Sequence, residues 1–215
     1  NHYVLKGSTV PDYPGAQTPG RVYRFTPAFA YGLTPNLELG LYILSTYDSH
    51  GDLSVDGEKM RLKFIAPRRG PRQDWYWGAN LEIGRVEHHL DLNPWNGELK
   101  GIFGFRKGRW IFATNTNLDF VVSGPNHTPA TIDQATKLAY QVSDNLALGI
   151  ESYDDFGSFG HWGGMQTHQV YATVDASWRG CDLNLCLGRG LTREGDAWVA
   201  KFIVGVPLHR PGRDD

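Results

Sequence analysis

Apolar and polar residues alternate along most of the chain, and this alternation constrains the fold more than any other feature. Residues 37–44 are an example, in which one parity is wholly apolar and the other is mixed: Leu37, Leu39, Leu41 and Ile43 alternate with Glu38, Gly40, Tyr42 and Leu44. A period of two places successive side chains on opposite faces of a β-strand. We therefore expect an all-β protein.

The same alternation recurs in about eleven segments. They are residues 21–33, 37–44, 60–64, 75–84, 98–106, 110–122, 132–142, 146–151, 170–178, 182–187 and 198–205. Most are near the roughly 9 to 11 residues with which a tilted strand crosses a bilayer. Residues 1–7, with Tyr3 and Leu5 on one parity, are expected to be the end of a further strand, which gives an even count of about twelve.

The connections between these segments alternate in length. Short ones are expected at residues 34–36, 67–74, 107–109, 143–145 and 179–180, and longer ones at 48–57, 88–96, 123–131, 153–166 and 190–196. Short turns at one end and longer loops at the other are typical of outer-membrane barrels. The expected fold is a single domain, residues 1–215, that forms a transmembrane antiparallel up-and-down β-barrel of about twelve strands, the first of them incomplete.

Composition is compatible with such a barrel. Hydrophobic residues make up 40% of the chain, and no run approaches the length of a membrane-spanning helix. Barrel strands look soluble on average because they alternate. The net charge of −2 gives no reason to expect a nucleic-acid partner. Residues 1–7 lack the basic start and apolar core of a signal peptide, so we expect a mature or truncated chain.

The alternation does not by itself say which face points inward, and a soluble sandwich or lipocalin-like barrel is the alternative. Three features favour a membrane barrel with a polar lumen. The apolar side chains are too bulky for a small interior, the polar parity carries both signs of charge, and Trp75, Trp77, Trp110, Trp178 and Trp198 lie near strand ends, as in an aromatic girdle. The predicted lumen-lining residues are Glu38, Arg61, Lys63, Asn80, Glu82, Glu98, Lys100, Asn115, Asn117, Asp119, Lys137, Glu151 and Lys201.

Two hairpins carry a family resemblance. Residues 31–40, YGLTPNLELG, and residues 140–149, YQVSDNLALG, both end a strand, turn through an Asn and open the next strand with Leu-x-Leu-Gly. They resemble proteobacterial outer-membrane barrels, in particular the transporters assigned to the phenol meta-pathway type. The resemblance implies a twelve-stranded pore for small solutes, aromatic ones among them, and carries over no binding or catalytic residue.

Two functions are open for the mixed-charge lumen. One is a narrow pore for small solutes in the bacterial outer membrane, with lipid and lipopolysaccharide around it. The other is a non-conducting scaffold whose lumen residues pair with one another and which holds partner subunits of an envelope complex. Twelve strands lie between filled eight-stranded barrels and open sixteen-stranded ones, so the strand count leaves both open. We expect no cofactor and no nucleic-acid partner.

A few residues are of types that could have a chemical role, but their expected positions in loops or near a rim explain them more simply. His88, His89 and Asp91 lie on an expected outer loop, as does His161, so we expect no metal site. The loop around His161 is a candidate to fold into the mouth of the barrel. Ser152 and the stretch 167–169, which holds His168, lie near an expected rim, but no nucleophile motif accompanies them, and we expect no enzymatic activity. Cys181 and Cys186 are five positions apart on one strand and are expected to be separate thiols on opposite faces.

Overall fold

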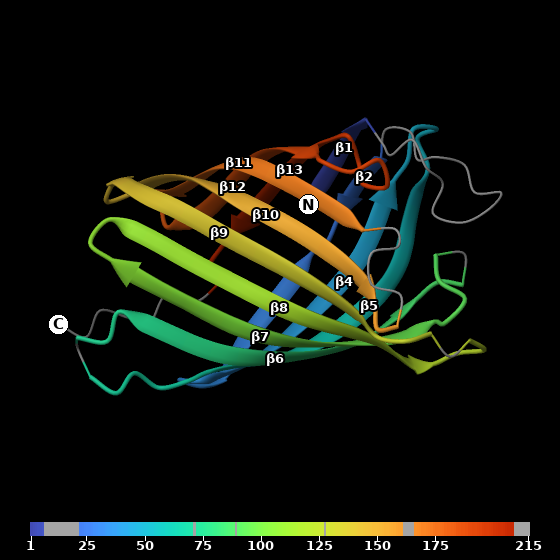
Figure 1. The fold of residues 1–215 in the computed structure, drawn as a ribbon, viewed down its shortest axis with the longest axis horizontal. Helices are drawn as coiled ribbons and strands as arrows, with labels where there is room; N and C mark the ends of the chain where they lie inside the picture. Colours follow the sequence, from blue (N-terminus) through green and yellow to red (C-terminus); the bar gives the residue numbers. More distant parts are fainter. Residues whose placement is uncertain (7–21, 71, 89, 127, 161–165, 209–215) are drawn as a thin grey trace.

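The computed structural model describes residues 1–6, 22–70, 72–88, 90–126, 128–160 and 166–208, and the regular structure in them is all β-sheet. Within these residues no helix is long and apolar enough to cross a membrane. Thirteen strands form one antiparallel sheet, which rolls into the tilted barrel seen from the side in Figure 1. The strands are β1 (His2–Lys6), β2 (Val22–Phe25), β3 (Ala28–Thr34), β4 (Leu37–Tyr47), β5 (Leu53–Ile65), β6 (Trp75–Val86), β7 (Trp95–Lys107), β8 (Trp110–Ser123), β9 (Thr131–Ser143), β10 (Leu146–Ser158), β11 (Thr167–Trp178), β12 (Cys181–Gly190) and β13 (Trp198–Gly205).

The barrel closes through its N-terminal strands. From β4 to β13 each strand pairs with its sequence neighbour, β1 joins β13 to β2, and β2 pairs with β4. Because β2 and β3 both pair with β4 along successive lengths, they occupy one position in the wall. The prediction of an antiparallel up-and-down barrel of twelve strand positions is confirmed, with one extra strand segment.

The prediction of one continuous strand over residues 21–33 is wrong, because the strand breaks between Phe25 and Ala28. Proline 27 lies in the break, and a proline has no backbone N–H to donate to a ladder. Its carbonyl still accepts a hydrogen bond from the Ile43 amide at 3.0 Å, so the segment stays beside β4. Among the described strands β3 pairs with β4 alone, and all of its residues are exposed.

The connections follow the expected asymmetry (Figure 1). The turn between β11 and β12 is one of the tight ones, because Trp178 pairs with Cys181 and only Arg179 and Gly180 lie between them. Both adopt positive φ, 51° and 81°, as a two-residue turn that matches the strand twist requires.

Two of the expected long loops are shorter than predicted. Strand β5 begins at Leu53 and β10 continues to Ser158, so parts of 48–57 and 153–166 are strand. In β10 the ladder to β11 continues through Asp154 opposite His168 and Asp155 opposite Thr167. Polar residues occupy both faces there, so the apolar–polar alternation ends before the strand does. Main-chain hydrogen bonding does not depend on that alternation and continues.

The two faces of the sheet differ sharply. The large apolar side chains on the outward face are exposed, among them Ile150 at 56%, Leu187 at 51% and Trp178 at 60%. The most buried residues on the inward face include Asn80, Glu151, Thr173 and Lys201. This distribution is the reverse of that in a soluble protein, where charged residues are almost never fully buried unless paired and large apolar patches are rare.

Exposed tryptophans mark both ends of the outward face. Trp75 and Trp110 begin β6 and β8 and Trp178 ends β11, all at the end with the short turns. Trp95 and Trp198 begin β7 and β13 at the opposite end. Two bands of aromatic side chains separated by an apolar surface are typical of membrane barrels.

Candidate functional site: the barrel lumen

The register places the predicted lumen residues on one face of the sheet, because directly paired residues on neighbouring strands share a face. Glu38 lies opposite Lys63, Arg61 opposite Glu82 and Glu82 opposite Glu98. The same row structure continues around the wall through the pairs Asn80–Lys100, Lys100–Asn117, Glu98–Asp119, Ile102–Asn115 and Lys137–Glu151, and Lys201 joins through its contact with Glu151.

A small ion cluster lies at the short-turn end of β4 and β5. The Glu38 carboxylate accepts hydrogen bonds from Arg61 Nη2 at 2.6 Å and Lys63 Nζ at 2.8 Å. These side chains are 20–29% exposed. One carboxylate therefore joins two cations in a site that water still reaches.

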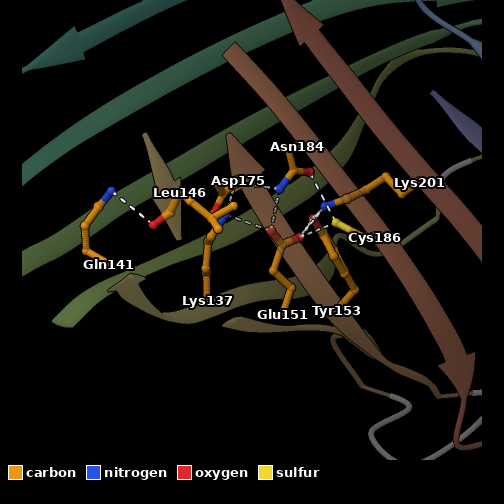
Figure 2. Close-up of polar contacts among 9 residues, drawn as sticks. All are labelled: Lys137, Gln141, Leu146, Glu151, Tyr153, Asp175, Asn184, Cys186 and Lys201. Carbon is orange, nitrogen blue, oxygen red and sulfur yellow. Dashed lines mark hydrogen bonds and ion pairs between the residues drawn. The ribbon is translucent and has the colours of Figure 1, made fainter. Parts of the chain in front are cut away.

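The Glu151 network is larger and drier, and Figure 2 shows it crossing from β9 to β13. Glu151 bonds Lys201 through Oε2, and its Oε1 lies 3.1 Å from Lys137 Nζ. The Tyr153 hydroxyl donates to Glu151 at 2.9 Å and accepts from Lys201 at 2.6 Å. The side chains of Lys201 and Glu151 are only 4% and 7% exposed.

A second carboxylate extends this network toward the short-turn end. Asp175 Oδ2 lies 2.6 Å from Lys137 Nζ, so Lys137 bridges Asp175 and Glu151. The Asn184 amide donates to Asp175 at 2.8 Å and to Glu151 at 3.2 Å, and the Cys186 thiol contacts Asn184 Oδ1 at 3.3 Å. Two lysines and two carboxylates are thus balanced, and their remaining polar contacts come from neutral side chains.

The end of the lumen nearer the long loops is acidic. Glu98 lies opposite Asp119, and Asp133 lies opposite Asp155. Within this group Lys100 bonds Glu98 at 2.8 Å. The charge along the lumen is therefore uneven, with carboxylates in excess toward the long loops and ion pairs nearer the short turns.

Three cavities follow one another through the barrel. A cavity of about 610 Å³ at the short-turn end shares Lys137, Asp175 and Asn184 with a middle cavity of about 270 Å³. The middle cavity shares Asn115, Ala135 and Tyr153 with a cavity of about 440 Å³ toward the long loops. Because neighbouring cavities have lining residues in common, the three adjoin one another in a series beside the Glu151 network.

The other residues considered for a chemical role lie partly in loops and partly in the lumen. His89 and His161 fall outside the described residues, and Asp91 accepts hydrogen bonds within its own loop from Asn93 and Asn96. Within the described residues no group of three or more His, Cys, Asp or Glu side chains is arranged to hold a metal ion. Cys186 is buried beside Asn184, and both cysteines are free thiols.

The residues near the expected rim divide between the two faces. Gln169 accepts a hydrogen bond from the lumen residue Tyr171 at 2.7 Å. His168 lies on the outward face, where its Nδ1 is 2.8 Å from Asp154 and its Nε2 is 3.4 Å from Gln166. Ser152 is on the same face as His168 but pairs in register with Val170.

Sequence reasoning missed several members of the Glu151 network. Asp175, Asn184 and Cys186 lie on the inward parity of β11 and β12, so their face was readable, but their convergence on Glu151 depends on barrel closure. Tyr153 was assigned to a loop because the strand was expected to end before it.

The chain matches no family model, and no curated protein matches it significantly.

Proposed function

We propose that this protein is a bacterial outer-membrane β-barrel that forms a narrow pore for small solutes. The exposed apolar surface between two aromatic bands supports insertion in a bilayer, since such a surface is costly in water. The observation that carries the pore proposal is the series of adjoining cavities in the lumen. The resemblance of the two hairpins to transporters of the phenol meta-pathway type rests on their motifs alone.

The charge distribution suggests which solutes enter. Carboxylates of Glu98, Asp119, Asp133 and Asp155 face the lumen toward the long loops. Wall charge of one sign raises the local concentration of counter-ions. We therefore expect the pore to prefer cations over anions.

The scaffold alternative rests on the Glu151 network. Its charges are balanced and hydrogen-bonded to each other, and the Glu151–Lys201 pair is buried, which is how residues that fill a barrel interior behave. The network occupies the β9–β13 side of the lumen, while the cavities also contact β8 through Ala113 and Asn115. A pore through a partly filled barrel is compatible with both observations.

Conductance across a planar bilayer tests the pore. We expect the native protein to conduct ions with a preference for cations. The Asn115→Trp variant should lose most of that conductance, because Asn115 borders both the middle cavity and the cavity toward the long loops. The matched control is Leu99→Trp, on the exposed outward face of the neighbouring strand, which should conduct normally. A folded native barrel that conducts no ions would leave the scaffold function.

Cysteine labelling on intact cells tests the orientation. In a Cys181→Ser/Cys186→Ala background, a cysteine at Ser158, at the long-loop end of β10, should react with an impermeant thiol reagent. One at Ser143, at the short-turn end of β9, should react only after the outer membrane is opened. The opposite pattern would reverse the orientation, and equal labelling of both would contradict a membrane-spanning barrel.

A further inference from the structure

The outward face carries a group of adjoining polar side chains, which take no part in the proposed pore. Two neighbouring rows of side chains are polar on a face that is otherwise mostly apolar, one row across β8–β10 and the other across β8–β11. We call this group the outward polar patch; it consists of Thr114, Thr116, Gln134, Thr136, Ser152, Asp154 and His168. The register makes it continuous, since Thr136 lies opposite both Thr114 and Ser152, and Asp154 lies opposite both Gln134 and His168.

Apolar rows enclose the patch on both sides. Toward the short turns, Leu138 lies opposite Phe112 and Ile150. Toward the long loops, Leu118 lies opposite Ile132, and the Phe156 ring packs against the His168 ring at 5.8 Å between centroids. On β8 and β9 the patch therefore lies within the apolar surface, and on β11 it reaches the long-loop end of the sheet, where His168 is the second residue of the strand and contacts Gln166.

The polar groups of the patch bond one another in part. The hydroxyls of Thr114 and Thr136 are 3.1 Å apart, and Gln134 Nε2 donates to Thr136 at 3.2 Å. Asp154 pairs with His168 at 2.8 Å. In the described part of the chain the structure records no hydrogen-bond partner for the hydroxyls of Thr116 and Ser152. Polar groups facing hydrocarbon are expensive, and such residues usually mark an interaction.

We propose that the outward polar patch is the surface through which two copies of this protein associate in the membrane. This inference rests on the membrane-spanning part of the proposed function and is independent of conduction. Acyl chains offer no hydrogen-bond partners, and apolar rows enclose the β8 and β9 residues of the patch on both sides, so the partner of this part of the patch is a protein surface. Most oligomers of one chain are two-fold symmetric and bring a patch against itself.

The chemistry of the patch suits pairing with itself. The hydroxyls of Thr116 and Ser152 and the amide of Gln134 each donate and accept hydrogen bonds, so each can bond a hydroxyl or amide of the patch on a second copy. The one carboxylate, Asp154, is hydrogen-bonded to His168 within the same copy, so it needs no partner from the second. Hydrogen bonds between such side chains are a recognised source of association in bilayers.

Disulfide cross-linking tests the proposal. In the Cys181→Ser/Cys186→Ala background, Ser152→Cys barrels in lipid vesicles are expected to form covalent dimers with copper–phenanthroline as oxidant. The matched control is Leu81→Cys, on the exposed outward face of β6 away from the patch, which should give few dimers. Equal cross-linking at both positions would overturn the proposal, since it would indicate random collision.

Sedimentation equilibrium in detergent micelles gives a second measurement. The Gln134→Leu/Thr136→Val variant should fold, because apolar residues suit the outward face, and should dimerise roughly tenfold more weakly. A native protein that stays monomeric, or a variant that dimerises as strongly, would overturn the proposal. A dimer that conducts no ions would contradict the pore proposal alone. A protein that is soluble without detergent would contradict the proposal that the barrel spans a membrane.

Discussion

Glu151→Gln is expected to lower the free energy of unfolding by about 3–5 kcal/mol, because it leaves a buried lysine without its counter-charge. Lys201 is 4% exposed, and the change replaces its carboxylate partner with a neutral amide; the Tyr153 hydroxyl that Lys201 also bonds is likewise neutral. Lys137 keeps Asp175, so the damage centres on Lys201. Denaturant unfolding in detergent micelles, followed by tryptophan fluorescence, measures the effect.

Two comparison variants isolate the cause. Glu38→Gln removes a carboxylate from two cations in the more exposed cluster, where side chains are 20–29% exposed, and should cost no more than about 1 kcal/mol. The double variant Glu151→Leu/Lys201→Met removes both charges and should recover part of the loss, because replacing a whole buried pair with apolar residues is often neutral. Equal stability of Glu151→Gln and the native barrel would show that water reaches Lys201 freely.

The alternation predicted the strands and which side chains of a strand share a face, because both depend on local periodicity. Leu37–Ile43 and Trp110–Val122 could be assigned to strands from side-chain pattern alone, and the structure has strands there. The break at Pro27 was also signalled in the sequence, since proline cannot donate to a ladder. The extension of β10 to Ser158 was not, because it depends on main-chain pairing with β11.

Contacts between residues on strands that are not sequence neighbours could not be predicted from the sequence pattern. Glu151 and Lys201 are 50 residues apart and meet only when β9–β13 curve into a closed wall. The outward polar patch was missed for another reason. In 110–122 and 132–142 four positions on the expected apolar face hold polar residues, Thr114, Thr116, Gln134 and Thr136, and each looks like an isolated exception within its own strand. Only the pairing register between strands shows that they adjoin. A period found strand by strand cannot reveal a cluster assembled across strands.

Adjacent substitutions in β8 should have opposite effects, which separates a membrane barrel from a soluble one. Leu118 lies near the middle of the strand, on the outward face between Leu99 and Ile132. In a bilayer, Leu118→Arg should cost about 2–4 kcal/mol, because an arginine near the midplane must leave water. Unfolding from lipid vesicles, monitored by the heat-dependent shift of the barrel on a gel, measures this cost.

The matched change, Asn117→Arg, should be tolerated within about 1 kcal/mol, because its side chain points into the lumen. Asn117 lies opposite Lys100 and Asp133, and it borders the cavity toward the long loops together with Asp155. Two carboxylates there can balance the new guanidinium, and the cavity supplies room and water for it. If the inward face were instead the packed core of a soluble barrel, the ranking would invert: Asn117→Arg would unfold the protein, while Leu118→Arg would be harmless and raise its solubility.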